Sequence, residues 1–316
     1  MPESPCEYRA LRRWSATAAV ALICALAGCA LPPWHSASEG VPAALRTLAS
    51  PAQRPDFVLL GEVHDHPQHH EMRARWLAEL ARETRFAIAM EQFDASRQAD
   101  IDRARAQGLS ARALAQAAGF EFGGWEWEHY GPFVELALRE GLPLAGANLS
   151  RAEGLRIARG QPHPLGGIEP SGWGETERSA MAAGIRDGHC GMLPERSIAP
   201  MASAQRARDA QMAQVMDRVR RDTGLPVVLI AGNGHVRSDL GVPRYLRDLM
   251  PQSRILVIGL LEEGSSRPSG AYDVQIVTAP KQRPDPCEGL RRQFEKRPPA
   301  GQTAAASPQA VARLPR

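Results

Sequence analysis

Six short apolar runs, separated by helical sequence patterns, restrict the fold of this chain more than any other feature. Runs of this length and hydrophobicity are typical of strands that are buried in a parallel sheet. We expect the last of them to form an edge strand. The predicted strands are residues 56–62, 86–92, 142–148, 226–232, 254–262 and 272–278.

Helical patterns occupy the sequence between these runs, and Pro67 suits the first turn of one of them. Strands that alternate with helices predict an α/β fold with a mostly parallel sheet flanked by helices. The stretches 93–141 and 149–223 are longer than a simple crossover, so we expect helical insertions over the carboxyl ends of the strands. The predicted helices are residues 67–83, 130–141, 201–224 and 242–250.

An apolar run near the N-terminus, "WSATAAVALICALAG", follows a basic segment. It is shorter than the ~20 residues of a membrane-spanning helix, so it predicts an export signal. The run ends in "LAGC", which resembles the lipobox of bacterial lipoproteins, where the cysteine is lipidated. We therefore expect residues 1–28 to be a lipoprotein signal peptide. Cys29 would anchor the protein in the bacterial cell envelope, on the periplasmic side of the outer membrane. The alternative is an ordinary signal peptide cut near Ala30.

The boundaries of the folded domain follow from this assignment. Residues 29–50 are expected to form a flexible tether and residues 51–288 the α/β domain. Residues 289–316 lack an apolar period and are expected to be a disordered tail. Outside the signal and the lipidation motif, the cysteines are Cys190 and Cys287. Because exported proteins keep disulfides, we expect these two to pair; the alternative is two unrelated buried thiols.

The composition argues against nucleic acid as a partner. The formal net charge is only +3, with many arginines matched by acidic residues, so no strong basic surface is expected. Aromatic residues make up 5% of the chain, which is too few for a broad base-stacking platform.

Polar side chains follow several of the predicted strands. Glu62 and His64 come at the end of the first strand, in the turn "GEVH". Glu91 ends the second strand, and His235 follows the fourth in "AGNGH". Ligands of open α/β sheets bind at the carboxyl ends of the strands, so we expect His64, Glu91 and His235 to meet. Two imidazoles and a carboxylate are a common ligand set for a divalent metal. The alternative for each histidine is a hydrogen bond to a neighbouring loop.

Four more residues of the same turn are interpreted differently. His66, His69 and His70 flank the start of a helix, and we expect them on its exposed face. Asp65 precedes Pro67, a position from which it could cap the helix N-terminus.

Longer motifs resemble one family. They are "LLGEVHDHPQHH", "AMEQFD", "WEWEHYGPF", "LPLAGANLSR", "HCGMLP", "QRARDAQMA" and "GNGHVRSDLGVPRYL". In this order they resemble the ChaN family of haem-binding lipoproteins, within the wider Tiki, TraB and erythromycin-esterase-like superfamily. The resemblance runs from about residue 55 to 280. It implies a Rossmann-like α/β core, a role in haem or iron acquisition, and haem held at a dimer interface with tyrosine ligation of the iron.

A tyrosine ligand has few candidates in the exported chain. Tyr130 lies in the aromatic stretch "GGWEWEHYGPF", which suits a porphyrin face, and is our first candidate. Tyr245 is the second, and the adjacent His129 is a third. Tyr272 lies in a predicted strand and is expected to be packed. The alternative is that the aromatic stretch only packs a helical insertion onto the sheet.

Other parts of the haem hypothesis concern its partners. Arg151 and Arg208 are candidate partners of the haem propionates. The Trp-rich stretch 125–133 is a candidate interface for a homodimer that forms on haem binding; the alternative is that Trp125 and Trp127 are buried within one subunit. An outer-membrane haem receptor is a further expected partner.

The second hypothesis is a metal-dependent hydrolase. The metalloprotease branch of the superfamily uses two Gly-x-x-His motifs and a glutamate, which correspond here to His64, His235 and Glu91. Glu62 would then be the general base for a metal-bound water.

Overall fold

The computed structural model describes residues 40–295, except residue 166 and residues 266–267. The expected signal peptide, Cys29 and the first half of the expected tether lie outside the described residues, as does the tail from residue 296. No helix within the described part of the chain is both long enough and apolar enough to cross a bilayer.

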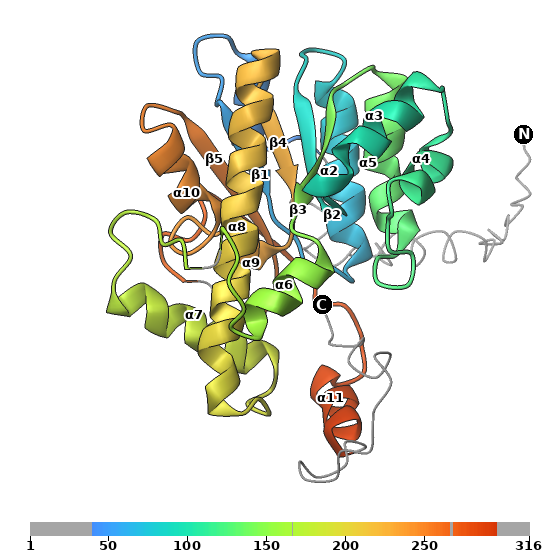
Figure 1. The fold of residues 1–316 in the computed structure, drawn as a ribbon. Helices are drawn as coiled ribbons and strands as arrows, with labels where there is room; N and C mark the ends of the chain where they lie inside the picture. Colours follow the sequence, from blue (N-terminus) through green and yellow to red (C-terminus); the bar gives the residue numbers. More distant parts are fainter. Residues whose placement is uncertain (1–39, 166, 266–267, 296–316) are drawn as a thin grey trace, which may run out of the picture. The chain divides into compact units, whose positions relative to one another are not determined.

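A six-stranded sheet in the order β3-β2-β4-β1-β5-β6 forms the centre of the fold (Figure 1). Every neighbouring pair of strands is parallel, so the predicted α/β class with a parallel sheet is confirmed. In register, Leu60 of β1 lies between Ile230 of β4 and Ile258 of β5. The strands are β1 (Phe57–Leu60), β2 (Ala87–Asp94), β3 (Leu144–Asn148), β4 (Val227–Ile230), β5 (Ile255–Glu262) and β6 (Val274–Thr278).

All six predicted strands are present, and their burial explains their sequences. The residues of β1 and β4 are buried on both faces, which is why these runs are continuously apolar. In β6 the exposed positions alternate with less exposed ones, as fits the predicted edge strand.

Helices cover both faces of the sheet, and each face has its own hydrophobic core. Val58 and Ile88 point into the first core, with Trp76 of α2 and Phe133 of α5. Their neighbours along the strands point into the second core, which α8 and α10 close (Figure 1). The helices are α1 (Ala43–Arg46), α2 (Pro67–Leu80), α3 (Gln98–Ala106), α4 (Ala111–Ala117), α5 (Trp127–Arg139), α6 (Arg151–Ala158), α7 (Glu175–Gly188), α8 (Glu195–Thr223), α9 (Asn233–Val236), α10 (Val242–Leu249) and α11 (Pro286–Glu295), with the 3-10 turns η2 (Thr47–Ala49) and η3 (Ala95–Arg97).

Both ends of the folded domain differ from the expected boundaries. The compact unit begins at Gly40, because Leu45 and Leu48 on α1 and η2 are fully buried in the first core. The expected tether therefore includes residues that pack. At the other end α11 continues to Glu295, so the expected tail without structure starts too early.

A disulfide joins Cys190, which follows α7, to Cys287 on α11. The two Cα atoms are 5.7 Å apart, although the cysteines are separated by 97 residues in the sequence. The expected pairing of these two cysteines is therefore confirmed.

Candidate functional site

The loops after β1 and β4 cross closely at the carboxyl end of the sheet, and two glycines allow it. A Cβ atom at Gly61 would lie 2.3 Å from Oδ1 of Asn233. At Gly232 it would lie 2.6 Å from Cε1 of His64. The ring of His64 therefore lies directly over the Gly232 backbone, whose N–H donates to the Glu91 carboxylate at 2.9 Å. Side chains from three strands thus meet at this edge, as the strand order requires.

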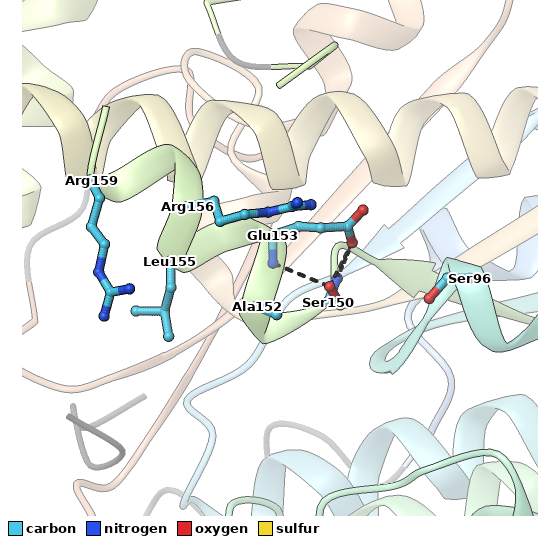
Figure 2. Close-up of a pocket in the computed structure, with 7 residues that line it drawn as sticks. All are labelled: Ser96, Ser150, Ala152, Glu153, Leu155, Arg156 and Arg159. Carbon is cyan, nitrogen blue, oxygen red and sulfur yellow. Dashed lines mark hydrogen bonds between the residues drawn. The ribbon is translucent and has the colours of Figure 1, made fainter. Parts of the chain in front are cut away.

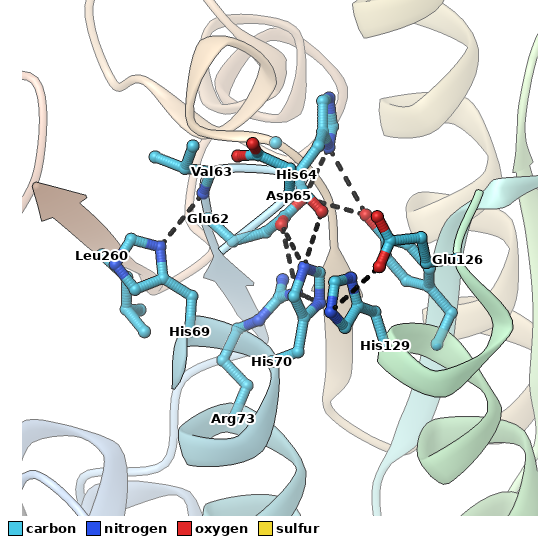
Figure 3. A network of polar contacts seen from close by, with 12 residues as sticks. Glu62, Val63, His64, Asp65, His69, His70, Arg73, Glu126, His129 and Leu260 are labelled. Atoms are coloured by element: carbon cyan, nitrogen blue, oxygen red, sulfur yellow. Dashed lines mark hydrogen bonds and ion pairs between the residues drawn. The ribbon is translucent and has the colours of Figure 1, made fainter. Parts of the chain in front are cut away.

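Glu62 is the centre of a buried polar network (Figure 3). Its Oε1 lies 2.6 Å from Nδ1 of His64 and accepts a hydrogen bond from the Tyr130 hydroxyl at 3.3 Å. Its Oε2 lies 2.9 Å from Nε2 of His70 and 3.7 Å from Nη2 of Arg73. Burial alone would raise the pKa of Glu62, but the charges of His64 and Arg73 hold it well below its usual range. Glu62 is therefore a carboxylate inside the protein.

His64 is the member of this network that reaches solvent. Its side chain is 31% exposed, whereas that of Glu62 is completely buried. The Glu62 charge opposes the effect of burial and raises the pKa of His64. With Nδ1 bonded to Glu62, Nε2 has no hydrogen-bond partner among the residues that the structure describes. An imidazole in this state can bind a proton or a metal ion through Nε2.

The expected exposure of His66, His69 and His70 is wrong, because all three are buried. His69 accepts from the Val63 N–H through Nδ1, at 3.1 Å, and its Nε2 lies 2.8 Å from the Thr278 hydroxyl. Burial lowers the pKa of His69 to about 3, so this imidazole is neutral.

A sequence signal for this burial exists. His69, His70 and Arg73 recur at the helical spacing that continues to Trp76, Leu77 and Leu80. They therefore lie on the buried face of α2. Polar residue type suggested exposure, but helical position decides which face a residue occupies.

Asp65 does not cap α2. The N-cap position is His66, and no side chain there makes a capping hydrogen bond. The Asp65 carboxylate instead pairs with Arg283 at 2.9 Å, and Arg283 also binds Glu262 at 2.6 Å. These ion pairs connect the β1 loop to the segment after β6.

His235 lies between two carboxylates. Its Nδ1 is 2.6 Å from Oδ1 of Asp209 on α8, and its Nε2 is 3.4 Å from Oε1 of Glu91. Burial would lower the pKa of His235, but these two carboxylates raise it to about 10. Conversely, His235 outweighs burial at Glu91 and lowers its pKa to about 2, whereas burial dominates at Asp209 and raises its pKa to about 6. His235 is therefore an imidazolium at neutral pH.

Sequence reasoning missed Asp209, although it lies in the motif "QRARDAQMA". The available signal is its position on α8. It precedes Met212, Ala213 and Met216 at helical spacing, so it occupies the buried face. A carboxylate there needs a charged partner, and His235 is that partner.

The expected divalent-metal site is not formed by these residues. His235 has both ring nitrogens committed to carboxylates, and His64 has one. Within residues 40–295, apart from the three that are not described, no group of three His, Cys, Asp or Glu side chains is arranged to hold a metal ion. His64, Glu91 and His235 are each engaged in ion pairs within the protein, so in this arrangement they do not form the metal site that the hydrolase hypothesis requires.

The tyrosines expected as haem ligands are turned inward. Tyr130 is completely buried, and burial together with Glu62 raises its pKa. Tyr245 is 5% exposed and donates its hydroxyl to the Ile168 carbonyl at 3.3 Å. Tyr272, which was expected to be packed and not to bind iron, is half-buried, and its hydroxyl donates to the Asn233 carbonyl at 3.4 Å. An iron could bind Tyr130 or Tyr245 only after its neighbours had moved.

The aromatic stretch packs within the subunit. Trp125, Tyr130 and Phe133 belong to the first core, and His129 stacks on His70 at 4.2 Å between ring centroids. Trp127 is partly buried against this core. Most of the stretch 125–133 is therefore interior and does not form the expected apolar surface patch.

Arg151 and Arg208 were expected to bind the haem propionates, but a different pair of arginines lines the cavity at this edge of the sheet. Arg208 donates to Oδ1 of Asn148 at 3.0 Å, and Arg151 also has contacts of its own. Beside them, an open cavity of 620 Å³ has the exposed Arg156 and Arg159 on its wall (Figure 2). It lies where β2 and β3 end and is lined by Ser96, Ser150, Ala152, Glu153, Leu155, Arg156 and Arg159.

Three solved structures are similar to this chain, and the first of them has the same fold. The structure of ChaN from Campylobacter jejuni, described with cofacial haem binding, matches with a TM-score of 0.60 and 23% identity, covering 70% of this chain and 86% of that one. An erythromycin esterase in its open conformation matches with a TM-score of 0.42 and 16% identity over 70% and 72% of the two chains. The type III effector HopBA1 has the same TM-score and 13% identity, over 79% of this chain and all of that one. No curated protein sequence matches.

The sequence itself matches the family described as "Haem-binding uptake, Tiki superfamily, ChaN" over residues 48–246. This range covers most of the chain and includes Glu62, His64, Glu91, Asp209 and His235. The chain therefore belongs to the ChaN family of haem-binding uptake proteins, a branch of the Tiki superfamily.

Proposed function

We propose that this protein binds haem and takes part in haem or iron uptake. The observation that carries the proposal is the family match over residues 48–246, which contains the whole strand-end network. The geometry supports it, because a partly exposed imidazole and a cavity with two arginines lie at the same edge of the sheet. Haem needs an axial ligand for its iron and basic groups for its propionates.

Titration of the lipid-free protein with haemin is expected to give a saturable Soret shift. The physical reason is that an axial ligand and an apolar contact change the electronic environment of the porphyrin. Sedimentation of the same samples tests whether a monomer becomes a dimer on haemin binding, as the resemblance implies. A spectrum equal to that of free haemin at every protein concentration would remove the proposal.

The cavity beside α6 is proposed to take the carboxylate edge of the porphyrin. Replacing both Arg156 and Arg159 by alanine is then expected to weaken haemin binding by roughly tenfold to a hundredfold, since hydrogen bonds to charged groups contribute about 1.5–3 kcal/mol. Haem dimethyl ester, which lacks the negative charges, should bind the variant and the parent protein alike. An exposed arginine elsewhere, Arg82, is the control when replaced by alanine. Equal haemin affinity in all three proteins would contradict this role.

We further propose that Cys29 is lipidated and anchors the protein in the cell envelope. The lipobox "LAGC" supports this, and so does the disulfide between Cys190 and Cys287, because disulfides persist in exported proteins. In bacteria fed a labelled fatty acid, the full-length protein is expected to incorporate label and to fractionate with membranes. Cys29→Ala should lose both properties, whereas Cys6→Ala should keep them. Label in the Cys29→Ala protein would show that the anchor lies elsewhere.

A further inference from the structure

We propose that residues 279–287, which lead from β6 into α11, form a redox-sensitive strap on the loop after β1. The disulfide between Cys190 and Cys287 keeps the strap on this loop, and reduction of the disulfide releases it. The same loop carries Glu62 and His64, so the redox state of the cysteines sets how firmly the strand-end network is held. This inference does not depend on the proposed haem binding.

The first half of the strap binds the loop after β1 through polar contacts. The Ala279 carbonyl lies 3.0 Å from Nε2 of His66, and Nζ of Lys281 donates to the Asp65 carbonyl at 2.6 Å. Arg283 donates to both carboxylate oxygens of Asp65, at 3.0 Å and 2.9 Å. Figure 3 shows Asp65 beside the residues of the buried network. The strap therefore contacts the part of the loop that directly follows this network in the sequence.

The ion pairs between the strap and the loop are too exposed to hold the strap alone. The side chain of Asp65 is 42% exposed, and those of Lys281 and Arg283 are 31% and 26% exposed. Ion pairs with this exposure contribute little to stability, because water competes for both charges. Glu262 is a better buried partner of Arg283, but it lies at the end of β5 and not on the loop. A further constraint is needed to keep the strap on the loop.

The disulfide supplies this constraint at the other end of the strap. Cys287 follows Arg283 by four residues, which span at most about 14 Å in an extended chain. With Cys287 joined to Cys190, Arg283 stays close to its carboxylate partners and re-forms the ion pairs after each opening. The helix α11 adds little, because Leu290 is the one buried residue among those of α11 whose burial is described.

A reductant can reach the disulfide, since Cys190 and Cys287 are both only partly buried. A thiolate of a dithiol attacks one sulfur and forms a mixed disulfide, which the second thiol of the reductant then resolves. Two electrons and two protons pass to the protein, which gains two thiols, and the dithiol becomes a disulfide. Exposed disulfides are the ones that exchange readily and serve in regulation. After reduction the strap retains only its exposed contacts.

The test is trypsin digestion of the folded, lipid-free protein, oxidised or reduced with dithiothreitol. In the bound strap Lys281 is a poor substrate, because its N–H and its side chain are both engaged. Reduction is expected to speed cleavage of the Lys281–Gln282 bond by at least about tenfold, since cleavage follows the population of the open strap. Cleavage after Arg159, which is exposed and lies outside the loop closed by the disulfide, is the internal control.

Two variants separate the ends of the strap. The double variant Cys190→Ser, Cys287→Ser should be cleaved at the reduced rate in both buffers, which excludes any other action of dithiothreitol. Arg283→Gln removes the ion pairs and leaves the disulfide in place, so cleavage after Lys281 should also quicken in the oxidised protein. Hydrogen exchange of residues 61–66 reports the loop itself, and it is expected to rise whenever the strap opens.

Each outcome decides the proposal without haemin, so it is independent of the function proposed above. Faster cleavage after Lys281 on reduction, with more exchange in residues 61–66 and an unchanged rate after Arg159, supports the strap. Equal cleavage after Lys281 in the oxidised and reduced protein would overturn it, because the disulfide would then have no part in holding the strap. A parallel rise after Arg159 would also overturn it, since reduction would then loosen the whole domain. Exchange that stays unchanged while cleavage rises would show that the strap does not hold the loop.

Discussion

Replacing Arg73 by methionine is expected to lower the free energy of unfolding by roughly 3–5 kcal/mol. Arg73 is completely buried on α2, where it donates to the Leu60 carbonyl at 3.0 Å and to Nδ1 of His70 at 2.9 Å. Its charge is also 3.7 Å from Glu62. Methionine fills a similar volume but leaves the Glu62 carboxylate without its permanent cation. An uncompensated buried charge costs several kcal/mol, which is the physical reason for the size of the effect.

Urea denaturation followed by circular dichroism measures this loss. Arg75→Met is the matched control, because Arg75 is exposed on the same helix and surface ion pairs contribute at most about 1 kcal/mol. Adding Glu62→Gln to Arg73→Met should recover part of the stability, since the stranded charge is then removed. Equal losses in Arg73→Met and Arg75→Met would mean that the buried pair does not stabilise the fold.

The sequence predicted the sheet well because a buried parallel strand has a simple signature. Each strand lies between two helical layers, so continuous apolar runs mark it without reference to the rest of the fold. The same topology explains why Glu62, His64, Glu91 and His235 were correctly expected at one edge. A residue just after a parallel strand lies at the carboxyl edge whatever the strand order is.

The chemistry of the site was harder to predict, because it depends on partners from helices. Asp209 reaches His235 from the middle of α8, and this contact turns a candidate metal ligand into an imidazolium. Tyr130 was chosen for its aromatic neighbours, but those neighbours bury it. In both cases the residue type and the local motif were interpreted correctly. The role of the residue, however, depends on the direction in which its side chain points.

Residues 41–49 show the same limit at a domain boundary. The Pro- and Ser-rich segment before them suggested a tether, yet Leu45 and Leu48 turn into the core at helical spacing. Two apolar residues in so short a helix are too few to be recognised by period alone.

Stability is expected to be greatest near pH 6.5 and to fall on both sides. His69 has a folded-state pKa of about 3 against an ordinary value of 6.5. Below pH 6.5 the His69 side chain binds a proton in the unfolded chain but not in the folded protein. The free energy of unfolding therefore falls as the pH falls toward 3. His235 has the opposite shift, to about 10. Its contribution is complete below pH 6.5 and is lost as the pH rises through 10.

Urea midpoints measured between about pH 4.5 and pH 6.5 report mainly the buried histidines and Asp209, because carboxylates with ordinary or lowered pKa values titrate below this window. Asp209 acts in the opposite direction: its pKa is raised to about 6, so its contribution to stability grows as the pH falls through 6. Within it the parent protein should lose unfolding free energy toward acid, because both His69 and His70 have pKa values lowered by burial and together outweigh the opposite contribution of the single Asp209. His69→Asn keeps an acceptor for the Val63 N–H but cannot titrate. This variant should be less stable than the parent at pH 6.5 and should lose less stability on acidification, while its alkaline loss, which His235 causes, stays the same. If the parent and His69→Asn lost the same unfolding free energy on acidification, His69 would not be held neutral in the folded protein. The acid sensitivity would then come from other groups.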